Sequence, residues 1–348
     1  MLAITVIPMR AGSARIDEVA EPPRAEGDLL VQTLVVGVCG TDLEINRGRY
    51  GWAPPGRERL VLGHESLGRV LEAPGGSDLQ PGELVVGIVR QPDPEPCVSC
   101  AAGEWDMCRN GRYTEHGIKE LDGFMRERYR IDPDHAVKVD PALERTGVLL
   151  EPTSVVAKAW DHIQRIAARA VWDPEVVLVT GAGPIGLLAA LLAVQRGLEV
   201  HVLDRATTGP KPALVADLGA TYHTGPVAGA VPSADVIVEC TGAGEVVLDA
   251  IVKAGPDGIV CLIGVSSAGR TLTIDAGALN RELVLENGVV FGSVNANRRH
   301  YQAATAALAK ADQRWLERLI TRRVPLSRWS EALQRRPDDV KAVVELSA

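Results

Sequence analysis

The sequence predicts a two-part α/β protein, in which a β-rich part is followed by a doubly wound parallel sheet. Over the first ~150 residues, short β-type runs such as "LLVQTLVVGV" and "ELVVGIV" are separated by glycine- and proline-rich turns. From about residue 170, runs such as "VVLVT", "EVHVLD" and "ADVIVE" alternate with helical stretches, which is typical of βαβ units. A glycine-rich turn also joins the first of these runs to an apolar helix.

Composition limits the classes of partner. The chain has 348 residues, enough for two ordinary domains, and a formal net charge of -8. Acidic and basic residues are mixed throughout, so no surface for nucleic acid or membrane is indicated, and a small neutral molecule is the expected partner. The first twenty residues lack the pattern of a secretory signal, which predicts a cytoplasmic protein.

One uncharged segment has the length of a membrane span. "VVLVTGAGPIGLLAALLAV" covers residues 176–194 without a charge. Glycines and a proline in its middle divide it into a β-branched run and an Ala/Leu-rich run. This pattern predicts a buried strand, a tight turn and a buried helix instead of a transmembrane helix.

The same turn has the spacing of a dinucleotide-binding loop. Gly181, Gly183 and Gly186 would allow the tight turn, the approach of a pyrophosphate, and close packing of helix on strand. Asp204 ends the next strand about 20 residues later, where a carboxylate can accept both ribose hydroxyls of NAD. Arg205 could instead bind a 2′-phosphate, so both NAD and NADP remain candidates, with NAD expected to be preferred.

The β-rich part contains possible metal ligands. Cys39 in "GVCGTD" and His64 in "LGHES" are zinc-ligand types, and Glu65 and Glu151 are possible oxygen donors. Bound metal would explain a histidine and a glutamate inside an apolar run, although a structural histidine with satisfied hydrogen bonds fits the spacing equally well. A second group, "CVSCAAGEWDMC", suggests metal ligation more than disulfides; it contains Cys97, Cys100 and Cys108.

These motifs together resemble those of the zinc-dependent medium-chain alcohol dehydrogenases. "GVCGTD", "LGHE", a cysteine lobe near residue 100, "EP" at 151–152 and "GAGPIG" occur in that family's order over nearly the whole chain. "RYTEHGI", "LDGFMRERY" and "FGSVNANRRHY" are similar to its glucose 1-dehydrogenase branch. The resemblance implies a GroES-like catalytic domain over residues 1–159, a Rossmann domain over 160–295, and a C-terminal segment, 296–348, that returns to the catalytic domain.

The resemblance also implies a catalytic zinc site. Cys39, His64 and Glu151 would hold the ion, and Glu65 could replace water as a transient fourth ligand. On the same basis, the cofactor site would comprise Gly181, Gly183, Pro184, Ile185, Gly186, Asp204, Arg205 and Val265.

The resemblance assigns further roles around the reacting sugar. Thr41 would hydrogen-bond the reacting hydroxyl, and Asp42 would orient a metal ligand. Glu115 and Asn295 match positions that contact sugar hydroxyls, although each is also an ordinary surface residue type. Many relatives have a proton-relaying histidine where this chain has Glu44, as the sugar branch does.

The chain departs from the family pattern in two places. Pro94 stands where the cysteine lobe has its first cysteine, so either Asp93 replaces that ligand or the lobe holds no metal. Arg90 occupies approximately the place of a sugar-contacting amide. It would recruit a more acidic or phosphorylated substrate, or pair with a nearby carboxylate.

The expected activity is oxidation of an aldose such as glucose at C1, with zinc and NAD or NADP, by a homodimer or homotetramer. Another polyol or secondary-alcohol dehydrogenase is the alternative within this class. A non-enzymatic alternative is a nucleotide-binding regulatory protein of the same fold, although the metal-ligand types argue for catalysis.

Overall fold

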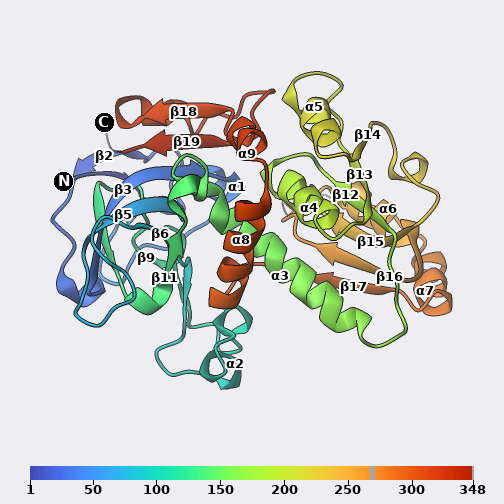
Figure 1. The fold of residues 1–348 in the computed structure, drawn as a ribbon, viewed down its shortest axis with the longest axis horizontal. Coiled ribbons are helices and arrows are strands. Elements are labelled where there is room, and N and C mark those ends of the chain that lie inside the picture. Colours follow the sequence, from blue (N-terminus) through green and yellow to red (C-terminus); the bar gives the residue numbers. More distant parts are fainter. Residues whose placement is uncertain (267–270, 347–348) are drawn as a thin grey trace. The chain divides into compact units, whose positions relative to one another are not determined.

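The computed structural model describes residues 1–266 and 271–346. The chain forms two compact units, one from Met1–Ser154 with Asn295–Ala348 and the other from Val155–Val294. Each unit has its own sheet (Figure 1).

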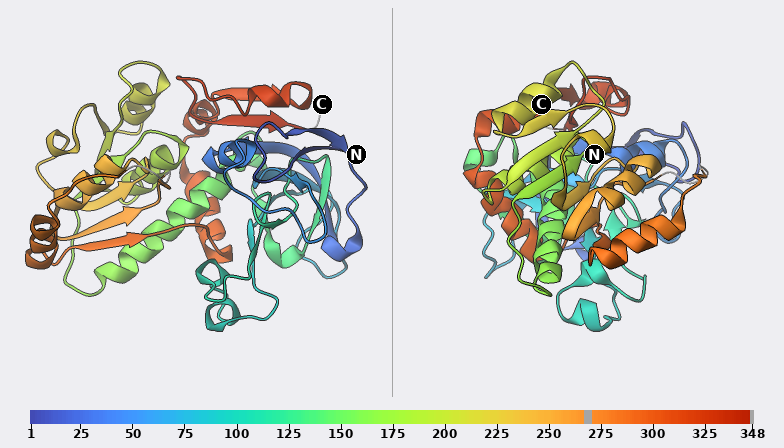
Figure 2. Two further views of the ribbon diagram at one scale, coloured as in Figure 1. Left: turned by 180° about the vertical axis from the view of Figure 1, so that it is seen from behind. Right: turned by 90° about the vertical axis from the view of Figure 1, so that its right-hand side faces the viewer.

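A mainly antiparallel seven-stranded sheet forms the centre of the first unit. Its order is β11-β6-β5-β3-β19-β18, and β10 pairs with β3 outside this path. The last two strands come from the end of the chain, and β19 pairs antiparallel with β3. Figures 1 and 2 show these red strands beside the blue N-terminal ones. The sheet strands are β3 (Leu29–Val38), β5 (Glu65–Glu72), β6 (Leu84–Gly87), β10 (Arg128–Ile131), β11 (Ala136–Val139), β18 (Arg322–Pro325) and β19 (Ala342–Glu345).

Two small sheets complete this unit. One has the order β2-β1-β4 and the other β7-β8-β9. The apolar residues buried in the core of this unit include Ile4, Leu62 and Phe124. The strands are β1 (Leu2–Val6), β2 (Arg15–Glu18), β4 (Leu60–Val61), β7 (Arg90–Gln91), β8 (Thr114–His116) and β9 (Glu120–Leu121); the helices are α1 (Gly40–Asn46), α2 (Val98–Ala101), α8 (Arg298–Lys310) and α9 (Gln313–Leu319).

The second unit is a parallel six-stranded sheet with helices. Its order, β14-β13-β12-β15-β16-β17, is that of a dinucleotide-binding doubly wound fold, and every neighbouring pair is parallel. The strands are β12 (Val176–Thr180), β13 (Glu199–Leu203), β14 (Thr221–His223), β15 (Ala234–Glu239), β16 (Ala254–Leu262) and β17 (Val289–Gly292); the helices are α4 (Pro184–Val194), α5 (Pro210–Asp217), α6 (Gly244–Lys253) and α7 (Ala276–Leu285). Helix α3 (Leu150–Ala167) begins in the first unit and ends in the second. The predicted fold class is confirmed.

The uncharged segment forms the predicted strand, turn and helix. β12 leads through a glycine turn into α4, whose residues are buried from Gly186 to Ala193. Pro184 is tolerated because it occupies the first turn, where its missing N–H has no intrahelical partner. Among residues 1–266 and 271–346, no helix has the length and apolar character needed to cross a membrane.

Candidate active site

Cys39, His64 and Glu65 form a compact group of metal-ligand atoms. Cys39 follows β3 and caps α1, whereas Glu65 begins β5. β3 and β5 pair with Gly37 opposite Glu65, which brings these strand ends together. The three ligand atoms all lie within 4.8 Å of one another, and Cys39 Sγ is 3.0 Å from His64 Nε2. Gly37 is required here, because a Cβ on it would lie 1.9 Å from the Glu65 carboxylate.

Asp42 supports this group from α1. The backbone N–H of Cys39 donates to Asp42 Oδ2 at 2.9 Å, and Asp42 Oδ1 faces His64 Nδ1 at 3.4 Å. Burial by itself would lower the pKa of His64, but the charges of Cys39 and Asp42 raise it well above its usual value. Burial likewise opposes ionisation of Asp42, yet His64 and the hydrogen bonds lower its pKa. Asp42 thus faces the imidazole of His64, the residue that the resemblance expects it to orient.

Sequence reasoning missed Lys341, which forms an ion pair with Glu65 Oε2. The side chain is fully buried, and it precedes β19, whose Ala342 lies opposite Val38. Burial would lower the pKa of this ammonium, but the charges of Glu65 and Cys39 raise it. A lysine at the start of the apolar run "AVVEL" was the available sequence signal, since buried lysines require a partner.

Glu151 lies beside this group without joining its ligand atoms. It is buried at the start of α3. Burial, followed by the charge of Glu65, raises the pKa of Glu151 to about 8. The ligand atoms that lie within 4.8 Å of one another belong to Cys39, His64 and Glu65, and Glu151 is not in this group. Thr41 is in α1, and its N–H donates to Cys39 Sγ at 3.2 Å.

Arg90, Glu115 and Asn295 form a second polar cluster in the same unit. Arg90 and Glu115 are opposite each other in the β7–β8 pair. Arg90 donates to Glu115 Oε1 through Nε at 3.0 Å and Nη2 at 2.9 Å, and Asn295 Nδ2 donates to the same oxygen at 2.5 Å. Of the two roles expected for Arg90, the structure shows pairing with a carboxylate.

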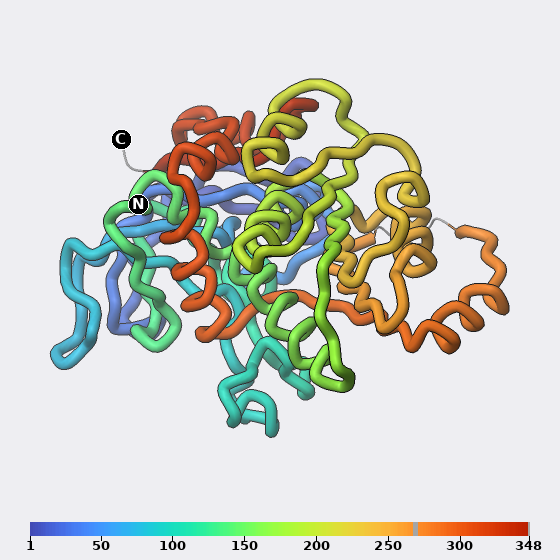
Figure 3. Tube along the Cα trace, turned by 45° about the vertical axis from the view of Figure 1, so that its right-hand side comes forward, coloured from blue at the N-terminus to red at the C-terminus, as the bar shows by residue number. Residues whose placement is uncertain are grey.

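The three lobe cysteines also lie together. The ligand atoms of Cys97, Cys100 and Cys108 are within 4.8 Å of one another. This part of the chain projects from the first unit as the teal segment around α2 (Figure 3). The N–H groups of Arg109 and Cys100 lower the pKa of Cys97 to about 6, whereas burial raises that of Cys100 to about 11. Asp93 is absent from the group.

The glycine turn has the geometry needed for a dinucleotide. Gly181 has φ +95°, and a Cβ on Gly186 would lie 1.7 Å from the carbonyl oxygen of Gly181. A Cβ on Gly183 would meet nothing within 4 Å, so the backbone there is open to a ligand. Ile185 lies in the first turn of α4, and Val265 is exposed beyond β16.

Asp204 ends β13 and contacts this turn. Its carboxylate accepts from the N–H of Ala182 at 2.7 Å and from that of Ala206 at 3.0 Å. Lys211 Nζ also donates to it at 3.0 Å, an interaction that sequence reasoning missed. Burial would raise the pKa of Asp204, but these three donors lower it. The neighbouring Arg205 is exposed.

Comparison with known proteins identifies the family. Residues 25–141 match the "Alcohol dehydrogenase GroES-like domain", and residues 144–346 match "Glucose dehydrogenase C-terminus". Glucose 1-dehydrogenase of Methanocella arvoryzae is 39% identical, with 100% of both chains covered. Glucose 1-dehydrogenase of Thermoproteus tenax is 38% identical, with 99% of both chains covered. The chain belongs to the glucose dehydrogenase branch of the zinc-dependent medium-chain dehydrogenases.

Solved structures agree with this membership. The glucose dehydrogenase of Haloferax mediterranei in complex with NADP, Zn and gluconolactone is 33% identical, with a TM-score of 0.92 and 100% coverage of both chains. Galactitol-1-phosphate dehydrogenase of Escherichia coli shares the fold, with a TM-score of 0.82 at 23% identity over 99% of this chain and 100% of that one. The predicted family is confirmed.

The donor chemistry of this glucose dehydrogenase relative fits a zinc ion. A thiol, an imidazole and a carboxylate are all zinc ligands in proteins. The acids Asp42, Glu65 and Glu151 are buried around Cys39, and the buried Lys341 is the cation paired with Glu65. A further cation among these buried acidic groups would stabilise their charged forms. The open backbone at Gly183 fits a pyrophosphate in the same way.

Proposed function

We propose that this protein oxidises an aldose such as D-glucose at C1, with NAD or NADP as hydride acceptor. The observation that carries the proposal is the meeting of Cys39, His64 and Glu65 in a chain related over its full length to glucose dehydrogenases. The resemblance implied Cys39, His64 and Glu151 as zinc ligands, with Glu65 as a transient fourth ligand. Because the ligand atoms of Glu65, and not those of Glu151, lie within 4.8 Å of the other two, we propose Cys39, His64 and Glu65 as the set, with Glu151 able to replace Glu65. Arg90 is already paired, so it does not favour the alternative of an acidic substrate.

Zinc, when bound, lowers the pKa of a coordinated hydroxyl or water. The chain's own groups would then position and deprotonate the sugar. Thr41 Oγ1 would accept a hydrogen bond from the C1 hydroxyl and relay its proton, releasing its own proton towards solvent as it takes up the hydroxyl proton. Asp42 would hold the His64 ring in one orientation. Asp204 would bind the adenosine ribose, and the Gly183 backbone would contact the pyrophosphate. Glu115 and Asn295 would bind other sugar hydroxyls.

The direct test is an initial-rate assay of nicotinamide reduction with a panel of aldoses, polyols and secondary alcohols, each with NAD and NADP. We expect aldoses to be the best substrates and a strong chelator to abolish turnover. Preference for a simple secondary alcohol would contradict the proposed substrate class. Turnover that survives exhaustive removal of zinc would contradict the metal site.

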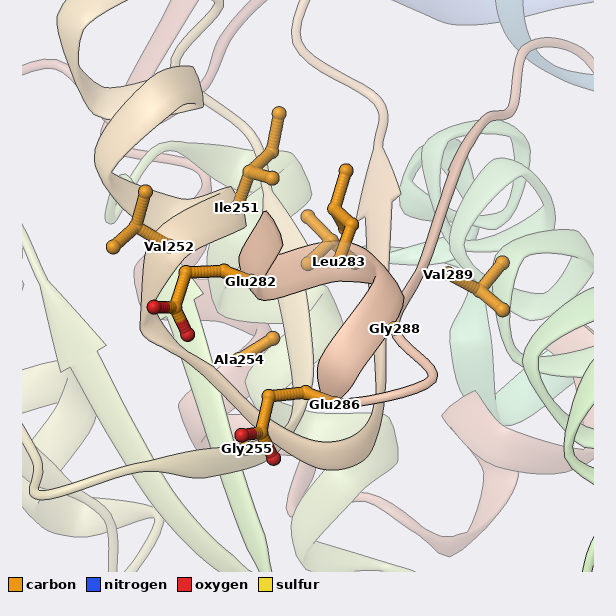
Figure 4. A pocket seen from close by; sticks show the side chains of 10 residues that line it. Ile251, Val252, Ala254, Gly255, Glu282, Leu283, Glu286, Gly288 and Val289 are labelled. Atoms are coloured by element: carbon orange, nitrogen blue, oxygen red, sulfur yellow. The ribbon is translucent and has the colours of Figure 1, made fainter. Parts of the chain in front are cut away.

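We also propose that the protein is a homodimer or homotetramer of the cytoplasm. All six cysteines are free, as expected in a reducing compartment. β17 ends the parallel sheet, and no residue from 271 to 292 is buried, although α7 and β17 are rich in apolar residues. Figure 4 shows Ile251, Val252, Leu283 and Val289 around a pocket between α6 and α7. A second copy covering this face would remove an open sheet edge and exposed apolar surface.

Light scattering after size-exclusion chromatography tests this assembly. Val284 is 65% exposed on α7, so Val284→Glu should leave the fold intact while shifting the mass toward one chain. Met9→Glu is the control, because Met9 is 66% exposed and belongs to the first unit. A wild-type mass of a single chain would refute the assembly.

A further inference from the structure

In the Arg90–Glu115–Asn295 cluster, the hydrogen bonds are made to one carboxylate oxygen of Glu115 and not to the other. Three donors converge on Glu115 Oε1: Nε and Nη2 of Arg90, and Nδ2 of Asn295. Glu115 Oε2 receives no hydrogen bond within the described residues. Glu115 is only 4% exposed, so its carboxylate is held in one direction, while Oε2 remains accessible. A buried carboxylate with one free oxygen is suited to accept from a ligand hydroxyl.

All three guanidinium nitrogens of Arg90 already donate hydrogen bonds within the protein. Its Nη1 donates to the carbonyl oxygen of Asp106 at 3.0 Å, while Nε and Nη2 are used by Glu115. The guanidinium also stacks on Tyr113, with 3.7 Å from Cζ to the ring centroid. The side chain is 8% exposed. Its charge is therefore neutralised within the protein instead of being directed to a substrate.

This cluster is connected to the zinc-ligand group through neighbouring backbone. Val89, next to Arg90, donates its N–H to the Tyr301 hydroxyl at 3.3 Å. Tyr301 lies close enough to Glu151 that this carboxylate, after burial, raises the pKa of the tyrosine. Glu151 in turn interacts with Glu65 and His64. The backbone gives a direct link: a Cβ on Gly117, two residues after Glu115, would lie 2.4 Å from the carbonyl oxygen of Gly63, which precedes His64.

Asn295 adopts a strained backbone to reach Glu115. Its φ is +63°, a left-handed conformation that asparagine adopts more readily than most residues. Strain of this kind persists where the surrounding structure requires it, and it is common at binding sites. Two elements from distant parts of the sequence therefore fix the same carboxylate oxygen.

We propose that Arg90 is a positioning residue that selects a neutral sugar: it saturates Glu115 Oε1 so that Glu115 Oε2 is presented to a substrate hydroxyl. This proposal rests on the proposed aldose oxidation and adds how the site recognises hydroxyls away from C1. Because Arg90 and Glu115 cancel each other's charge, Arg90 offers no net positive charge to a sugar phosphate or sugar acid.

The test compares Arg90→Gln and Arg90→Lys with wild type. A glutamine donates one weaker hydrogen bond, so Glu115 loses its fixed direction, and KM for D-glucose should rise about ten-fold. Values of kcat, KM for the cofactor and zinc content should stay near wild type. Arg90→Lys keeps a charged donor and should recover part of the lost affinity. Arg128→Gln, which removes an exposed arginine–glutamate pair, is the matched control.

Monodeoxy derivatives of D-glucose separate positioning from general stability. The derivative that lacks the hydroxyl bound by Glu115 should bind wild type weakly and be nearly insensitive to Arg90→Gln, whereas the others should lose affinity as glucose does. A purely structural role for Arg90 would affect all sugars equally and would overturn the proposal. If Arg90→Gln fails to fold, the same panel with Arg90→Lys decides.

Two other results would also overturn it. An unchanged KM for glucose in Arg90→Gln would show that Arg90 does not position the Glu115 carboxylate for substrate binding. Efficient use of glucose 6-phosphate by wild type, lost in Arg90→Gln, would show that Arg90 binds the substrate anion directly. A wild-type protein that oxidises none of the aldoses would instead refute the proposed function, which is a distinct outcome.

Discussion

At the scale of single residues, the zinc-ligand group depends on a thiol that is held in place by α1. Cys39 accepts the N–H of Thr41 and lies 3.0 Å from His64 Nε2, so serine fits the space but is a much poorer zinc ligand. Cys39→Ser should lose zinc and at least about 100-fold in kcat together. Metal analysis and steady-state rates check this.

The control for Cys39→Ser is Cys240→Ser, because Cys240 belongs to neither group of ligand atoms. It should keep wild-type zinc content. Normal turnover by Cys39→Ser after dialysis against a chelator would remove Cys39 from the proposed metal site.

Cofactor choice is also decided by individual side chains. Asp204, if it binds the ribose as proposed, would repel a 2′-phosphate, but Lys211 lies 3.0 Å from its carboxylate and offsets that charge. Asp204→Asn should shift the ratio of kcat/KM values toward NADP by about ten-fold, which corresponds to about 1.4 kcal/mol. Lys211→Ala should shift it toward NAD, since the compensating cation is lost.

Lys253→Ala, on the exposed end of α6, is the control for these cofactor variants. Measurements with both cofactors at several salt concentrations would report the charge effect, because salt screens it. An unchanged ratio in Asp204→Asn would place this carboxylate away from the ribose.

At the scale of structural elements, the cysteine lobe is a segment whose short α2 carries few buried residues. Asp93 is not in the thiol group, and both of its carboxylate oxygens accept hydrogen bonds elsewhere, Oδ1 from the Glu95 N–H and Oδ2 from Asn110 Nδ2. We expect three thiolates to hold a second zinc there. Cys100→Ser should remove that zinc and lower the melting temperature while kcat stays near wild type, as shown by metal analysis and calorimetry.

Asp93→Asn, measured together with Cys100→Ser, tests whether Asp93 is a fourth ligand. It should leave the second zinc bound, because the amide oxygen still accepts from the Glu95 N–H and only the contact with Asn110 is lost. Loss of zinc in this variant would instead identify Asp93 as the fourth ligand. A wild-type protein with a single zinc would show a metal-free lobe.

The elements of the second unit were readable from sequence because the signals are local. The glycine spacing at 181–186 and the β-branched run before it fix a strand, a turn and a helix within about twenty residues. Glu239 shows what remained hidden. This buried carboxylate accepts from the N–H groups of Thr241 and Gly242, and its backbone carbonyl accepts from Ile263 and Gly264. It joins the ends of β15 and β16 through contacts that no single motif encodes.

The metal-ligand group was predictable only in part, for a similar reason. Ligand types at Cys39 and His64 are visible in the sequence, but their proximity depends on the register of β3 and β5. Lys341 reaches Glu65 only because the end of the chain returns as β19 beside β3. Long-range pairings of this kind have no periodicity, so Lys341 and the Arg90–Glu115 pair required the structure.

At the scale of the whole molecule, acid stability depends on a buried imidazole. His116 stacks on Phe124, and its Nδ1 lies 2.8 Å from the carbonyl oxygen of Asp122. Burial lowers the pKa of His116 to about 3, although the Asp122 carbonyl opposes this shift. The folded protein therefore stays neutral at this position under mildly acidic conditions, in which an unfolded histidine, with a pKa near 6.5, takes up a proton.

The sign of the resulting pH dependence follows from proton binding. Above pH ~6.5 neither state is charged at His116, and this group makes stability independent of pH. Between pH ~6.5 and ~3 only the unfolded state binds the proton, so the free energy of unfolding falls by up to about 1.4 kcal/mol per pH unit. His116→Asn keeps a donor for Asp122 but does not titrate. Its loss of stability between pH 7 and 5 should therefore be about 2 kcal/mol smaller than that of wild type.

Urea unfolding at a series of pH values measures this difference. His223→Asn, which changes a half-exposed ring, is the control and should alter the pH dependence much less. Parallel pH curves for wild type and His116→Asn would mean that other groups control unfolding in acid.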